Sequence, residues 1–175
     1  ADGSNSKKLL DQGQDADCSP DGKSIFYTVK NQIYRMSVDG ADPVKIADTP
    51  EDAFGLKVSP DGTLITFAYQ EGSPVPVGKL GIVAATGGAA RFVAPVPIGG
   101  RFLHWSPSGK TIQYRLTRNG ASNIWEQPLS GAVPRQITNF TSGLIFDFAW
   151  TLDGKQLLLA RGNETSDVIL ISNFR

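Results

Sequence analysis

The chain is poor in the residues that most often carry chemistry. Its 175 residues include one cysteine, one histidine and one methionine, and 17 basic side chains balance 17 acidic ones. A single cysteine excludes an internal disulfide. A single histidine argues against a metal site built from several imidazole ligands. The balanced charge gives no reason to expect nucleic acid as a partner, because phosphate backbones attract strongly basic surfaces.

The sequence also lacks long apolar runs and helical periodicity. No stretch approaches the roughly 20 consecutive apolar residues that a membrane-spanning helix requires, so we expect no direct membrane insertion by this segment. No segment shows a convincing period of 3.6 residues, which argues against helices throughout the chain.

Four short stretches of the chain are copies of one another. The first reads Cys-Ser-Pro-Asp-Gly-Lys-Ser-Ile-Phe-Tyr, and the copies begin at Cys18, Val58, Trp105 and Trp150. Their starts are 40, 47 and 45 residues apart. A repeat of this length is typical of the four-stranded blades of β-propellers.

Each copy contains a turn with a clear physical logic. We call these the repeat turns: residues 19–22, 59–62, 106–109 and 151–154. Serine can accept a hydrogen bond from the turn backbone, proline presets its own φ, and the final glycine supplies a left-handed conformation. All four copies keep the glycine, whereas Leu152 replaces the proline and Ser108 replaces the aspartate. The sequence suggests that backbone geometry alone accounts for this glycine.

Alternating runs surround each repeat turn and predict four strands per unit. Apolar residues alternate directly after the turn, and another strand precedes it. The third strands are expected at 32–38, 80–84, 123–129 and 167–172, and the fourth at 44–47, 91–94 and 134–138. A β-sandwich would not place the same turn at the same point four times. The sequence therefore predicts an all-β propeller of about four blades, each a four-stranded antiparallel sheet.

The position within the repeat at which the sequence begins and ends predicts the role of its first and last strands. Residues 1–10 correspond to an outer strand, of a preceding blade or of a closing blade, and the chain ends on a third strand. We expect the segment to be part of a larger ring, although four blades that close on themselves remain an alternative. Exposed blade faces would also favour a homodimer, in which two copies complete a ring of eight.

The turn, preceded by tryptophan and followed by an alternating strand, resembles the TolB-like propeller repeat, a relative of the WD-type blade. The segments 134–150 and 157–174 are similar to the C-terminus of certain bacterial signalling proteins. Those begin with a serine/threonine kinase or a winged-helix regulator and end in a propeller. The resemblance implies a non-enzymatic module for protein interaction or ligand sensing, in a signalling or envelope protein. It also implies an extracytoplasmic location, either periplasmic or tethered to the membrane.

The same repeat occurs in proteins with other functions. It is found in the periplasmic protein TolB, in the gating propellers of prolyl oligopeptidase-like serine peptidases and in oligogalacturonate lyases. The chain has no Gly-x-Ser-x-Gly elbow, and its only histidine, His104, has no nucleophile to serve. We therefore predict no catalytic, cofactor or metal residues. The gating domain of a peptidase and a TolB-like periplasmic component stay open as alternatives.

Four residues are the candidates for contact with a partner or ligand. Asp17, Lys57 and His104 occupy equivalent positions on the innermost strands, and Asp147 lies in a neighbouring column that it shares with Asp15. We expect a protein partner or a small ligand to bind at one mouth of the propeller, where these side chains become accessible. The alternatives are that His104 is merely solvated, and that Asp15 and Asp147 form hydrogen bonds at the strand edge or bind a cation near the axis.

The residue before each repeat turn is predicted to be part of the core. Cys18 stands where the other copies carry Val58, Trp105 and Trp150. We therefore expect Cys18 to be a buried small hydrophobe rather than a nucleophile. We also expect Trp125 and Tyr34, on the third strands, to pack between blades.

Overall fold

The computed structural model describes residues 6–97, 103–151 and 153–165. Within these ranges the chain forms fourteen β-strands and no helix. No helix capable of crossing a membrane is therefore found in the described part of the chain. The predicted all-β class is confirmed.

The strands form successive antiparallel sheets. The first contains β1 (Ala16–Cys18), β2 (Ser24–Val29), β3 (Gln32–Ser37) and β4 (Val44–Asp48). The second contains β5 (Phe54–Val58), β6 (Leu64–Glu71), β7 (Val77–Ala84) and β8 (Arg91–Pro95). The third contains β9 (His104–Trp105), β10 (Thr111–Arg118), β11 (Ala121–Pro128) and β12 (Arg135–Gln136). The fourth pairs β13 (Leu144–Trp150) with β14 (Leu157–Gly162). In each of the first three, consecutive strands are neighbours, so each sheet is the simple meander expected of a blade.

The predicted strands correspond closely to the observed ones. The expected third strand at 32–38 is β3, and the expected fourth strand at 44–47 is β4. In the third blade the outer strand is shorter than expected, because only Arg135 and Gln136 pair with β11. The strand expected at 167–172 lies outside the described residues.

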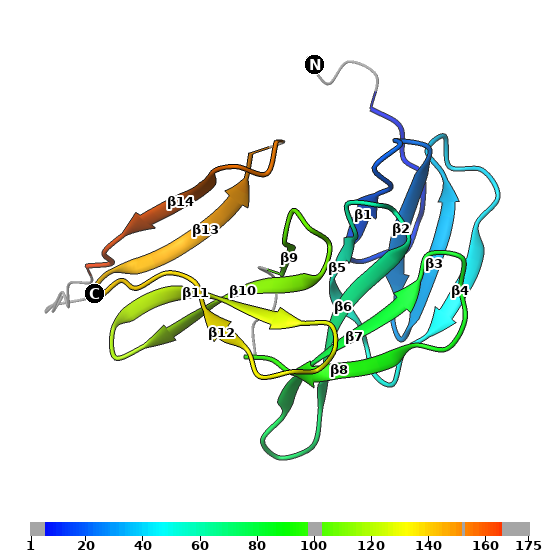
Figure 1. The fold of residues 1–175 in the computed structure, drawn as a ribbon. Helices are drawn as coiled ribbons and strands as arrows, with labels where there is room; N and C mark the ends of the chain where they lie inside the picture. The colour runs from blue at the N-terminus through cyan, green and yellow to red at the C-terminus, as the bar shows by residue number, and fades with distance from the viewer. Residues whose placement is uncertain (1–5, 98–102, 152, 166–175) are drawn as a thin grey trace, which may run out of the picture.

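The four sheets follow one another around an arc. Figure 1 shows this arc from the blue first sheet to the orange fourth, with β1, β5 and β9 on its inner side. Contacts join β1 to β5 and β5 to β9, so the innermost strands of neighbouring blades meet. This arrangement brings residues about 40 positions apart in the sequence to the same inner surface.

The hydrophobic core lies mainly between blades. One cluster joins the first and second blades and includes Phe26, Ile33, Leu56 and Phe67. A second joins the second and third blades and includes Leu80, Ile82, Trp105 and Ile112. A third, formed by Ile124, Ile145 and Phe148, joins the third and fourth blades. Each blade is therefore stabilised largely by the neighbour it covers.

The repeat turns have the predicted backbone geometry. In the first turn the Gly22 amide donates to the Ser19 carbonyl at 2.9 Å, and Gly22 has a φ of 70°. The Ser19 hydroxyl donates to Asp21 Oδ1 at 2.5 Å and accepts from the Ser24 amide at 2.9 Å. The same backbone bond closes the other three turns, and their glycines have φ values of 66° to 72°.

Neighbouring repeat turns also interlock, which the sequence analysis missed. A Cβ added to Gly62 would lie 3.3 Å from Pro20 Cδ of the preceding turn. A Cβ on Gly154 would lie only 2.7 Å from Pro107 Cβ, whereas one on Gly22 would meet nothing within 4 Å. The proline of one turn therefore sits beside the glycine of the next. The interpretation that backbone geometry alone explains these glycines is incomplete.

The prediction that Cys18 is buried is wrong, because its side chain is exposed. The equivalent Trp105 is 8% exposed and donates its indole N–H to the Lys57 carbonyl of the preceding blade at 3.0 Å. The half-buried Trp150 likewise donates to Gln113 of the third blade at 2.7 Å. This position faces the preceding blade, and no blade precedes the first one among the described residues.

The segment before β1 covers part of the first blade. Lys7 Nζ donates to the Asp39 carbonyl at 2.9 Å, and Leu9 lies against Gly40. Residues 6–10 form no strand, and residues 1–5 lie outside the described residues. The assignment of residues 1–10 to the outer strand of a preceding or closing blade therefore stays a prediction.

Candidate functional site

The four candidate residues lie one on each blade, all on inner strands. We call them the inner-strand row: Asp17 on β1, Lys57 on β5, His104 on β9 and Asp147 on β13. The antiparallel hairpins place the first three of these residues at equivalent heights, since Asp17 pairs with Phe26, Lys57 with Thr66 and His104 with Gln113, whereas Asp147 lies two residues before the equivalent position of β13. Equivalent positions in successive repeats thus become neighbouring side chains on the inner strands.

Asp17 joins the first blade to the second. Its Oδ2 accepts a hydrogen bond from the Val58 amide at 2.9 Å, and its Oδ1 lies 4.0 Å from Lys57 Nζ. Two residues earlier, Asp15 Oδ2 accepts from the Gly55 amide at 2.7 Å. Asp15 therefore makes a hydrogen bond at the strand edge, as one of the two alternatives predicts. Asp17 has a structural role between blades that the sequence analysis did not foresee.

His104 on β9 and Asp147 on β13 form the second pair of the row. The distance from His104 Nε2 to Asp147 Oδ1 is 3.9 Å, and the imidazole packs on the Phe148 ring with centroids 4.4 Å apart. Burial lowers the pKa of His104 below its usual value, an effect that nearby Asp147 opposes. Lys57 lowers this pKa further and Asp17 opposes the change, so the charges of the whole row act on one imidazole. His104 is accordingly neutral at pH 7.

The two pairs of the row, Asp17 with Lys57 and His104 with Asp147, are loose and partly open to solvent. Separations of 4.0 and 3.9 Å are longer than hydrogen bonds. The side chains of Lys57 and Asp147 are 36% and 67% exposed. Pairs of this kind contribute little to stability, so exchanging them for contacts with a ligand costs little. The row can therefore offer an ammonium, a carboxylate and a neutral imidazole to a bound molecule.

The site contains no recognisable catalytic arrangement in the described part of the chain. Among the described residues, the His104 imidazole lies beside the Asp147 carboxylate and the Phe148 ring rather than beside a serine, cysteine or threonine nucleophile. Within residues 6–97, 103–151 and 153–165, no group of three or more histidine, cysteine, aspartate or glutamate side chains is placed to hold a metal ion.

Comparison with known proteins identifies the fold. No protein-family model matches the chain. The uncharacterized protein Atu1656 of Agrobacterium fabrum is 28% identical over 126 residues, which are 69% of this chain and 41% of that protein. The structure of TolB from Acinetobacter baumannii matches with a TM-score of 0.60, covering 73% of this chain and 33% of that one, at 20% identity. The fold is that of a TolB-like β-propeller.

Other TolB-like propellers have names that indicate different activities. Hydrazine synthase from Kuenenia stuttgartiensis matches with a TM-score of 0.59 at 19% identity, covering 86% of this chain and 44% of that one. The dihydro-heme d1 dehydrogenase NirN matches with a TM-score of 0.56 at 15% identity, covering 86% and 33%. The chain thus spans less than half the length of each of these proteins. One fold serves proteins of different activities, so function has to be argued from the site.

Proposed function

We propose that this TolB-like propeller is a non-enzymatic binding module that recognises a protein partner through the inner-strand row. The observation that carries the proposal is the pairing of four polar side chains from four blades into two loose, solvent-accessible pairs. The parent protein is a bacterial signalling or envelope protein, and the module lies outside the cytoplasmic membrane. The resemblance of the repeat to that of TolB supports this placement.

The scaffold suits such a role because it holds the row in place before binding. Each member is borne on a strand, and Asp17 and Asp15 tie the first inner strand to the second. The Arg115 guanidinium similarly donates to the Ile145 carbonyl at 2.6 Å and ties the third blade to the fourth. Side chains on rigid elements lose little conformational entropy when they bind.

The charges of the row define the kind of segment that fits. A basic side chain of the partner pairs with Asp147, the most exposed member, and an acidic side chain pairs with Lys57. His104 lies between these two charges and, being neutral, can both donate and accept a hydrogen bond. The partner segment therefore carries both signs of charge.

Site-specific photo-crosslinking in cells that express the full-length parent tests this proposal. A photoreactive residue replaces Lys57 or His104, and Lys110, an exposed lysine next to the third repeat turn, is the control position. We expect one discrete protein adduct from positions 57 and 104, none from position 110, and loss of the adduct when Asp147→Lys is added. Equal adducts at all three positions, or none at 57 and 104, would contradict the proposal.

The proposed location has a separate test. Protease added to spheroplasts should digest the propeller while cytoplasmic marker proteins stay intact. Protection of the propeller until the membrane is lysed would place it in the cytoplasm.

A further inference from the structure

A pocket lies between the repeat turns of the first two blades. Its volume is about 330 Å³, at the lower end of the range for small-molecule sites. It is lined by Ser19, Pro20, Asp21, Ser24, Phe26, Arg35, Asp61, Gly62, Ala85 and Thr86. We call it the turn pocket. No residue of the inner-strand row contributes to it.

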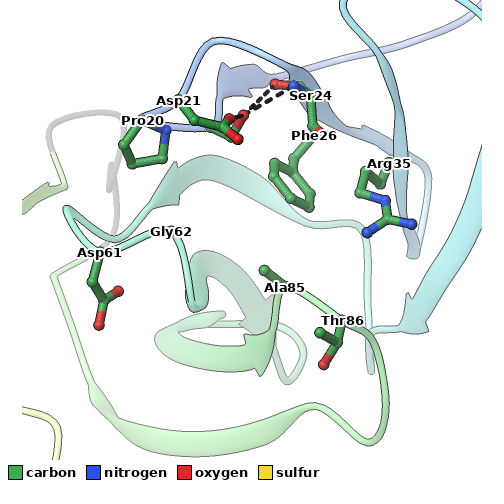
Figure 2. Close-up of a pocket in the computed structure, with 10 residues that line it drawn as sticks. Pro20, Asp21, Ser24, Phe26, Arg35, Asp61, Gly62, Ala85 and Thr86 are labelled. Atoms are coloured by element: carbon green, nitrogen blue, oxygen red, sulfur yellow. Dashed lines mark hydrogen bonds between the residues drawn. The ribbon is translucent and has the colours of Figure 1, made fainter.

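One end of the turn pocket is anionic. Asp21 and Asp61 come from equivalent positions of two successive repeat turns (Figure 2). Hydrogen bonds from the Ser19 hydroxyl and the Lys23 amide lower the pKa of Asp21. The corresponding bonds from Ser59 and Thr63 lower the pKa of Asp61 to about 2. Both carboxylates are therefore ionised at every pH near neutrality.

These turn bonds leave half of each carboxylate available. The recorded donors to Asp21 and Asp61 all reach the Oδ1 atoms. Among the described residues, the hydrogen bonds to these carboxylates leave both Oδ2 atoms without a donor. The turns thus orient two charged groups and keep one oxygen of each open to a ligand.

The other end of the turn pocket is cationic and polar. Figure 2 shows Arg35, from β3, and Thr86, after β7, on the side opposite Asp61, with the Phe26 ring between the two ends. The described residues provide no ion-pair partner for Arg35. Phe26 and Ala85 line the turn pocket between these two ends (Figure 2), so apolar side chains separate the opposite charges.

We propose that the turn pocket binds a small ω-amino acid, a zwitterion whose carboxylate and ammonium group stand at opposite ends of a methylene chain. Its carboxylate pairs with the Arg35 guanidinium, its ammonium group lies between Asp21 and Asp61, and its methylene chain packs on Phe26. A simple anion would meet two carboxylates and a simple cation would meet a guanidinium. Only a ligand with both charges, separated by an apolar chain, satisfies both ends.

Calorimetric titration of the 175-residue chain tests the pocket with 6-aminohexanoate as the probe. This molecule carries a carboxylate and an ammonium at the ends of five methylene groups. Hexanoate and hexylamine are the matched single-charge probes. We expect saturable binding of 6-aminohexanoate and at least about tenfold weaker binding of each single-charge probe, because each lacks one charge-assisted contact. No saturable binding at millimolar probe, or equal binding of hexanoate, would overturn the proposal.

Substitutions locate the binding in the turn pocket. Arg35→Gln and Asp61→Asn should each weaken 6-aminohexanoate binding by about tenfold or more. Asp153→Asn is the control for Asp61→Asn, because Asp153 also accepts from the turn hydroxyl and from the amide two residues on, in the fourth repeat turn outside the pocket. It should leave binding unchanged. Circular dichroism verifies that each variant is folded. Unchanged binding by folded Arg35→Gln, or an equal loss in Asp153→Asn, would overturn the assignment.

Discussion

The first and third blades carry nearly the same repeat turn in different surroundings. In the first, Cys18 is exposed and a side chain at Gly22 would meet nothing. In the third, Trp105 is 8% exposed and bonded to the preceding blade, and Gly109 faces Pro60 of the preceding turn. Because the turn backbones match, the difference comes from the neighbour. In this repeat, burial is a property of the joint between two blades rather than of one blade.

The largest expected effect comes from the residue that begins each copy. Trp105→Ala should reduce the free energy of unfolding by about 3–5 kcal/mol, since it leaves a cavity between blades and removes the bond to the Lys57 carbonyl. Cys18→Ala, the same position in the first blade, should change it by less than about 0.5 kcal/mol. Urea unfolding measures both. Similar losses would show that the first blade has a covering partner in solution.

The glycine of the repeat turn gives the second comparison. Gly22→Ala should cost about 1 kcal/mol, the strain of a left-handed residue with a side chain. Gly154→Ala should cost about 1–3 kcal/mol more, because its Cβ would overlap the Pro107 ring. Chemical denaturation of the two variants measures the difference between their free energies of unfolding. Equal costs would mean that backbone strain alone decides, as the sequence analysis assumed.

A smaller effect is expected at the joint between β1 and β5. Asp17→Ala should cost about 1–2 kcal/mol, because the Val58 amide loses a charged acceptor. Hydrogen exchange of that amide should accelerate. Lys57→Ala is the control, since its 4.0 Å pair with Asp17 is worth less than about 1 kcal/mol. If Lys57→Ala proved the more costly change, the ion pair rather than the hydrogen bond would hold the joint.

The smallest expected effect is a loss of folding stability at low pH, to which Asp21 and Asp61 of the first two repeat turns should both contribute. The pKa of Asp61 is lowered to about 2, and that of Asp21 is also lowered. A depressed carboxyl pKa adds stability that is present above the unfolded pKa of 3.8 and is lost as pH falls towards 2. The Tm gap between the wild type and Asp61→Asn should therefore narrow over that interval. Asp21→Asn should follow the same course, and a gap that widened in acid would contradict the assignment.

The sequence predicted the structure within each blade better than it predicted the contacts between neighbouring blades. Period-two alternation and the turn residues identified the all-β class and most strands, because both are set by interactions within one hairpin. The burial of Cys18 was predicted wrongly because equivalence between repeats says nothing about which copies have a neighbour. The pairing of Asp17 with the Val58 amide was missed for the same reason, since it crosses between blades.

The candidate site shows the same division. Column equivalence brought Asp17, Lys57 and His104 to notice, because repeats place equivalent residues at equivalent heights. It gave no sign that Arg35 and Asp61 would line one pocket, since they occupy different columns of different blades. A comparison of equivalent positions in the repeats cannot reveal contacts between positions that are not equivalent.

The interlock of proline with glycine gives the array a direction. The first three repeat turns each place a proline ring beside the glycine of the next turn, as Pro107 does beside Gly154. Two such turns fit only head to tail, so a second copy would meet this one with its first turn against the last turn here, and not with like turns facing each other. An array of this kind can grow by duplicating one repeat, because the new copy brings both halves of its joint.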